Sequence, residues 1–127
     1  MEFARYNRQT GLDILLELTN PDYVNLMMDV YWTQRGGKSP VTLMKQYANR
    51  VKVIHLRDYQ VTLNKMKADY TASDCALGDG NLDVKMMIET AVDIGVSYLA
   101  IEQDTKKPFE EIEKSLQYLK ALGTELF

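Results

Sequence analysis

Three nearly continuous apolar runs stand out along the chain, and each becomes polar toward its carboxyl end. They cover residues 24–32 (VNLMMDVYW), 51–58 (VKVIHLRD) and 97–104 (SYLAIEQD). Continuous apolar runs of this length are typical of parallel strands that are covered on both faces. We therefore predict three buried strands over these ranges.

Helical patterns lie between and around these runs. Apolar residues gather over residues 12–18, 40–47, 82–94 and 108–122, which we predict to be helices. In the last range they recur at intervals of three or four, as the buried stripe of an amphipathic helix requires. Ser39 is expected to cap the second helix, which begins at Pro40, and Asn81 the third, which Gly95 ends. The alternating order predicts an α/β protein with right-handed crossovers and a parallel sheet. Residues 59–80 are predicted to form a long, partly ordered loop, a length that is often functional.

The composition is that of a globular protein and narrows the functional classes. Of 127 residues, 46% are hydrophobic and 26% are charged, which excludes a disordered chain. No stretch approaches the ~18 consecutive apolar residues of a membrane span, and the start MEFARYNRQTG has no apolar signal region. The single cysteine, Cys75, excludes an internal disulfide and favours a reduced, cytoplasmic compartment. A net charge of −3 without a basic stripe argues against nucleic acid. We expect one domain over residues 1–127, with neither membrane nor nucleic acid among its partners.

The polar ends of the three predicted strands supply a candidate metal site. In parallel α/β proteins, ligands bind at the carboxyl ends of the strands. Asp29, His55 and Glu102 stand at these ends, each two residues after an apolar residue on the same strand face. Neighbouring strands would thus present a carboxylate, an imidazole and a carboxylate in register. This set suits a divalent cation, with Mn²⁺, Zn²⁺, Mg²⁺ and Co²⁺ all open.

Each polar residue at the strand ends also has a plainer interpretation. A lone histidine on a strand is more often structural, and a carboxylate at a strand end is often a helix cap or a solvated group. Asp58 and Asp104 either orient the ligands of a site or cap loops. Trp32 could form an apolar wall for the face of a sugar, or pack outward, since period two places it opposite Asp29. The segment GDGN at 78–81 is either a tight turn or a backbone site for an anion.

Four short motifs, in order along the chain, carry a resemblance to a known family. They are MDVYW at 28–32 with GG at 36–37 and Pro40; RV at 50–51 through HLRD at 55–58; GDGNLD at 78–83; and GV at 95–96 through EQD at 102–104. They resemble, respectively, a Leu-Asp-x-Tyr-Trp strand with its following Gly and Pro, an Arg-Val … His-Leu-Lys-Asp strand, a Gly-Glu-Gly-x-x-Asp turn, and a strand ending in Glu-x-Asp. These are motifs of the xylose isomerase-like TIM barrels, the sugar phosphate isomerases and epimerases, and the resemblance covers residues 2–122.

The resemblance implies a divalent metal ion held by two Glu, one Asp and one His. Asp29, His55 and Glu102 match three of these ligands by position, and Arg57 replaces the usual Lys. The fourth ligand, a Glu on an earlier strand, has no counterpart in this chain. A complete barrel has ~250 residues, so the implied fold is a partial (half) TIM barrel, the C-terminal half, with three or four parallel strands alternating with helices.

The implied activity is isomerisation or epimerisation of a sugar or sugar phosphate through an ene-diolate, with the metal stabilising the developing oxyanion. Glu102 would be both a ligand and an acid/base, while Arg57, Asp58, Asp104 and Trp32 would support the site or contact substrate. Two other interpretations stay open: a non-catalytic half barrel or oligomerising domain, and a metal-dependent phosphodiesterase or nuclease, against which the acidic charge argues. Unpaired sheet edges predict a homo-oligomer.

Overall fold

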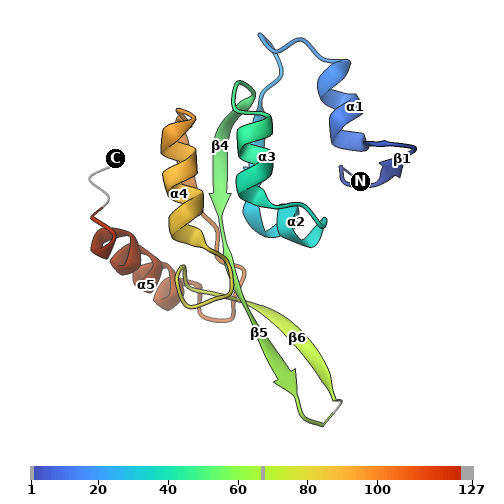
Figure 1. The fold of residues 1–127 in the computed structure, drawn as a ribbon. Coiled ribbons are helices and arrows are strands. Elements are labelled where there is room, and N and C mark those ends of the chain that lie inside the picture. The colour runs from blue at the N-terminus through green and yellow to red at the C-terminus, as the bar shows by residue number, and fades with distance from the viewer. Residues whose placement is uncertain (1, 67, 124–127) are drawn as a thin grey trace.

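The computed structural model describes residues 2–66 and 68–123, so residues 1, 67 and 124–127 of the predicted domain lie outside the described part (Figure 1). Its strands are β1 (Arg5–Tyr6), β2 (Gln9–Thr10), β3 (Leu26–Asp29), β4 (Val51–Leu56), β5 (Asp58–Asn64), β6 (Asp69–Cys75) and β7 (Tyr98–Ile101). Its helices are α1 (Gly11–Glu17), α2 (Val30–Arg35), α3 (Pro40–Gln46), α4 (Val84–Asp93) and α5 (Pro108–Ala121). None of the described helices combines the length and the hydropathy of a transmembrane segment.

A parallel sheet of three strands, in the order β3-β4-β7, organises the described chain. Asp29 pairs with His55, and His55 pairs with Ala100, so the carboxyl ends of the strands lie side by side. The backbone N–H of Glu102 donates to the carbonyl of Leu56 at 3.1 Å and continues the ladder past the end of β7. The predicted α/β fold with a parallel sheet is confirmed.

The two faces of this sheet differ in what covers them. Ile54 and Leu56 are fully buried in a core with Met44 of α3 and Ile88 of α4, helices that lie next to each other (Figure 1). On the opposite face Met27 is 61% exposed. The prediction of strands covered on both faces is therefore wrong for the described part. A closed barrel buries that second face in its interior, whereas three strands leave it open.

The first predicted strand ends three residues early. β3 stops at Asp29, and residues 30–35 form α2, whose first N–H groups need acceptors. The Asp29 carboxylate supplies one by accepting from the backbone N–H of Trp32 at 2.8 Å. An apolar run cannot by itself distinguish a strand from a buried helix. The predicted position of Trp32 opposite Asp29 on a strand is therefore wrong: Trp32 is helical and 55% exposed.

The loop predicted over residues 59–80 is largely an antiparallel hairpin. β5 and β6 pair from Asp58↔Cys75 to Asn64↔Asp69, and the hairpin projects away from the helices (Figure 1). Only Arg57 separates β4 from β5. Most side chains of the hairpin are exposed. Because exposed strands need no buried apolar face, the sequence has no apolar pattern here from which the strands could be predicted.

The amino-terminal residues do not add a fourth parallel strand to the sheet. Strand β1 pairs with β2 in an antiparallel hairpin, which leads into α1. Thr10 caps α1 and exchanges hydrogen bonds with Asp13, a capping box. Ser39 caps α3 as predicted, whereas α4 is capped by Asp83 rather than by Asn81.

Candidate metal centre

Asp29, His55 and Glu102 come together at the carboxyl ends of β3, β4 and β7. Each offers one ligand atom, and these three atoms lie within 4.8 Å of one another. His55 Nδ1 is 3.0 Å from Glu102 Oε2 and 3.9 Å from Asp29 Oδ2. Two carboxylate oxygens and one imidazole nitrogen are ligands that suit a divalent cation of hard or borderline character. The donor set on this sheet edge therefore fits the implied metal.

Asp29 is fixed by the helix that follows it. One carboxylate oxygen caps α2 through the N–H of Trp32, and its carbonyl accepts the hydroxyl of Thr33 at 2.7 Å. The other carboxylate oxygen faces His55 and Arg57. Burial raises the pKa of the Asp29 carboxyl, opposed by the Trp32 N–H and the Arg57 guanidinium. The cap thus orients a carboxylate toward the cluster.

Arg57 is a buried cation directly beside the cluster. Its Nη1 donates to Glu102 Oε1 at 3.1 Å and lies 3.8 Å from Asp29 Oδ2, while its Nη2 donates to Asp74 at 2.5 Å. Its guanidinium carbon lies 4.7 Å from the centre of the Tyr31 ring. Among the described residues, Arg57 Nε has no hydrogen-bond partner. Arg57 therefore connects the hairpin to two of the three candidate ligands.

Sequence reasoning missed Asp74 entirely. It lies on β6, opposite Tyr59, and its side chain is 9% exposed. In the sequence it falls within a stretch that we predict to be a loop, with no partner at a recognisable spacing. Antiparallel pairing of residues 58–64 with residues 69–75 would have placed it near Arg57.

Asp58 organises the base of the hairpin rather than the metal cluster. Its buried carboxylate accepts the backbone N–H groups of Tyr59, Gly78, Gly80 and Leu82 at 2.8–3.1 Å. Burial raises its pKa, and these four hydrogen bonds oppose that shift. A Cβ on Gly80 would lie 2.1 Å from Asp58 Oδ1, so only glycine fits there. Of the roles that the sequence left open for Asp58, its contacts support loop capping, and the anion that the turn at 78–81 binds is Asp58 itself.

A cleft of about 520 Å³ adjoins the cluster on the hairpin side. Trp32, Asp104, Lys106 and Arg57 are among its lining residues, together with Ala72, Ser73 and Asp74 of β6. Trp32 and Asp104, both expected to support the site or to contact substrate, therefore lie on one cleft with Arg57. Cys75 is buried, and its burial raises the pKa of the thiol to about 12, so it has no character of a nucleophile.

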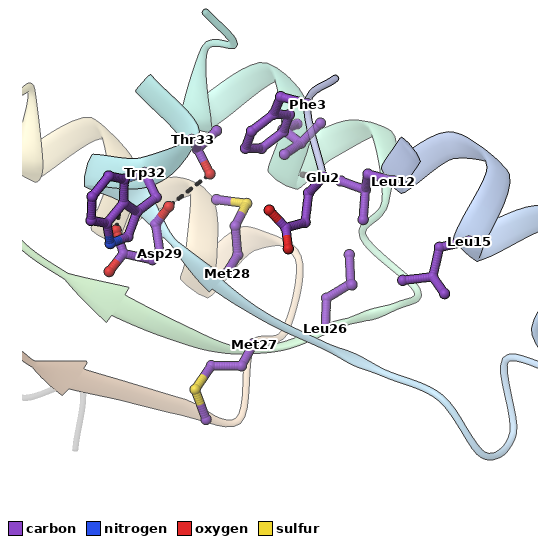
Figure 2. Close-up of a pocket in the computed structure, with 11 residues that line it drawn as sticks. Glu2, Phe3, Leu12, Leu15, Leu26, Met27, Met28, Asp29, Trp32 and Thr33 are labelled. Carbon is purple, nitrogen blue, oxygen red and sulfur yellow. Dashed lines mark hydrogen bonds between the residues drawn. The ribbon is translucent and has the colours of Figure 1, made fainter. Parts of the chain in front are cut away.

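A second cavity, of about 330 Å³, runs along β3 and is mostly apolar. Figure 2 shows the carboxylate of Glu2 turned toward Met28 and Leu26, with Asp29 farther along the same cavity. Glu2 does not belong to the group of atoms within 4.8 Å that Asp29, His55 and Glu102 form. The described residues thus bring three ligands together.

Comparison with known proteins places these features in a fold. Over 91–94% of its length the chain superposes on a sugar phosphate isomerase/epimerase from Parabacteroides distasonis (TM-score 0.70, 29% identity), on a second protein of that description from the same organism (0.76, 24%), and on a xylose isomerase domain protein from Planctomyces limnophilus (0.69, 20%). It covers 38–43% of those chains. The chain therefore has the fold of part of a TIM barrel, as these neighbours do.

The chain also has relatives by sequence, and those compared are inosose dehydratases. The chain is 30% identical to an inosose dehydratase from Lacticaseibacillus casei and 26% identical to one from Clostridium tetani. These matches cover 85–87% of the chain, which spans about two fifths of each relative (42% and 41%). No protein-family model matches the chain. The predicted resemblance to xylose isomerase-like barrels is confirmed, and the partial barrel with it.

Proposed function

We propose that this part of a xylose isomerase-like barrel holds a divalent cation on Asp29, His55 and Glu102 and serves in isomerisation or epimerisation of a sugar or sugar phosphate. One observation carries the proposal: three ligand atoms at the carboxyl ends of three adjacent strands lie within 4.8 Å of one another. The names of the relatives, sugar phosphate isomerase/epimerase and inosose dehydratase, support a polyhydroxylated carbonyl compound as the class of substrate.

The exposure and the hydrogen-bond partners of each residue suggest a different role for it in the proposed reaction. A bound cation would supply Lewis-acid stabilisation of negative charge on the substrate oxygens. The side chain of Glu102 is 42% exposed, and Glu102 would be the carboxylate that accepts or returns a substrate proton. The carboxylate of Asp29 is held by its hydrogen bond at the start of α2, so Asp29 would hold the cation in place rather than transfer a proton. Trp32, exposed on the adjacent cleft, would cover the apolar face of a sugar ring.

Metal binding is the first test of this function. Mn²⁺ titrated into the chain, followed by calorimetry, should give one site per chain. His55→Ala should abolish that site, because it removes one of three ligands, while the exposed Gln60→Ala on β5 should leave it unchanged. If the unsubstituted chain binds no Mn²⁺, or if His55→Ala binds it equally well, the proposed metal site is wrong.

Catalysis is a separate test, because the chain spans only about two fifths of its relatives. Ketoses and their phosphates should be incubated with the Mn²⁺-loaded chain and with Glu102→Gln. Turnover that Glu102→Gln loses would support an enzyme. Bound Mn²⁺ without turnover would instead support the second candidate, a non-catalytic half barrel, which the open inner face of the sheet favours.

We also propose that the chain forms a homo-oligomer. Within the described part, β3 and β7 each pair only with β4, so each presents a free edge. Edges of this kind pair readily with a second chain. Elution as a monomer at micromolar concentration in size-exclusion chromatography would contradict this proposal.

A reducing, cytoplasmic setting agrees with a single buried thiol.

A further inference from the structure

Arg57 places a positive charge beside the candidate metal ligands. A fixed cation sits against two of the residues that would hold a metal ion, Asp29 at 3.8 Å and Glu102 at 3.1 Å. Like charges repel, so a guanidinium in this place should weaken binding of any divalent cation. Burial makes the repulsion strong, since the Arg57 side chain is only 6% exposed and salt screens it weakly.

Asp74 changes that balance without touching the cluster. The carboxylate of Asp74 accepts a hydrogen bond from Arg57 Nη2 at 2.5 Å, while Nη1 faces Glu102 and Asp29. With Asp29, Glu102 and Asp74 ionised, three carboxylates and one guanidinium give a formal charge of −2, which matches a divalent cation. Without Asp74 the same group carries −1.

We propose that Asp74 is a positioning residue that acts through Arg57: as the counter-ion of the guanidinium, it leaves the charge of Asp29 and Glu102 available to a divalent cation. The proposal rests on the metal site proposed above and extends it into the hairpin. If Glu102 bound a cation, Arg57 would keep Asp74 as a partner, because its two nitrogens serve different carboxylates. Strand β6 thereby contributes to the site although none of its residues is a ligand.

Mn²⁺ binding to the whole 127-residue chain, measured by calorimetry, tests the proposal. Asp74→Asn should weaken Mn²⁺ binding about tenfold, at the lower end of what residues that support metal ligands contribute. The matched control is Asp69→Asn, which removes the same charge from an exposed position of the same strand and should leave the affinity unchanged. Asp74→Glu, which keeps the charge, should restore most of the affinity.

A second background separates this role from a merely structural one. In Arg57→Gln the competing cation is gone, so Mn²⁺ should bind at least as tightly as to the unsubstituted chain. Adding Asp74→Asn to Arg57→Gln should then cost clearly less than it does alone, because the pair is coupled. If Asp74→Asn alone fails to fold by circular dichroism, Arg57→Gln decides: weaker Mn²⁺ binding in that variant would overturn the proposal.

The outcomes also distinguish this proposal from the proposed function. If the unsubstituted chain binds Mn²⁺ and His55→Ala does not, but Asp74→Asn behaves like Asp69→Asn, the role of Asp74 is wrong and the metal site stands. An equal loss from Asp74→Asn with and without Arg57 would likewise overturn the role. If the unsubstituted chain binds no Mn²⁺, both proposals fall.

Discussion

The parallel sheet and the β5–β6 hairpin are consecutive parts of the chain, but different forces hold them. The sheet is held by apolar burial: Ile54 and Leu56 are buried against α3 and α4. The hairpin exposes most of its side chains and is held by its ladder, by the buried carboxylate of Asp58 at its base and by Asn81, which accepts the N–H of Val61 at 2.8 Å. An apolar core tolerates neighbouring substitutions of similar volume, whereas a single buried acceptor that serves four donors has no substitute.

The largest expected effect lies in the sheet. Ile54→Ala should lower the free energy of unfolding by about 2–5 kcal/mol, because it opens a cavity in a fully buried site. Met27→Ala, on the open face of the neighbouring strand, should cost within about 1 kcal/mol. Urea unfolding followed by circular dichroism measures both. Equal losses would mean that the inner face of the sheet is covered in solution, for example by a second chain.

The next effect lies at the base of the hairpin. Asp58→Asn replaces one acceptor oxygen with an amide group that itself donates. Two of the four backbone N–H groups then lose their acceptor, for example those of Gly78 and Gly80 if Oδ2 is the oxygen replaced. We expect a loss of about 1–3 kcal/mol in the same urea experiment. Asp79→Asn, an exposed neighbour in that turn, is the control and should stay within about 0.5 kcal/mol. A loss in the control as large as in Asp58→Asn would show that the turn, not the buried acceptor, matters.

Acid should destabilise the molecule through Asp13, in the first turn of α1. The hydroxyl of Tyr47 and the capping box with Thr10 lower the pKa of Asp13 from 3.8 to about 2. The stability that ionised Asp13 contributes is therefore present above about pH 4 and lost as the pH falls toward 2. Asp13→Ala should cost about 1 kcal/mol at pH 7 and should flatten the stability curve between pH 4 and 2. Asp22→Ala, at an exposed position, should keep the unsubstituted curve.

The smallest effect is expected on the outer part of the hairpin. Val61 is 44% exposed on β5, so Val61→Thr, a residue of similar shape and strand preference, should change stability within about 0.5 kcal/mol. The comparison with Ile54→Ala, on the same continuous stretch of chain, isolates burial as the cause of the difference. A loss above 1 kcal/mol at Val61 would indicate that another surface covers the hairpin.

These two regions also mark the limit of what the sequence could reveal. Apolar runs located β3, β4 and β7, and period two along them brought Asp29, His55 and Glu102 to one edge. The same runs could not show that α2 starts at Val30, because the cap that decides it is Asp29 itself. Exposed, polar strands leave no such pattern, so β5 and β6 were missed, and with them the contact of Asp74 with Arg57. A contact made by strand pairing needs the register, which local sequence does not carry.

Arg57, the single residue between β4 and β5, also makes the chain sensitive to length at this point. One inserted residue would rotate everything after it by half a strand period, and would carry Asp58 away from the turn that it holds. Near the opposite end of the hairpin, Leu63 and Tyr70 pair across the ladder and are both exposed, so a longer connection there would displace no core residue. That tip is the natural place to insert a reporter segment. The junction at Arg57 thus fixes the register of the hairpin at its base, whereas we expect the far end to accept extra residues.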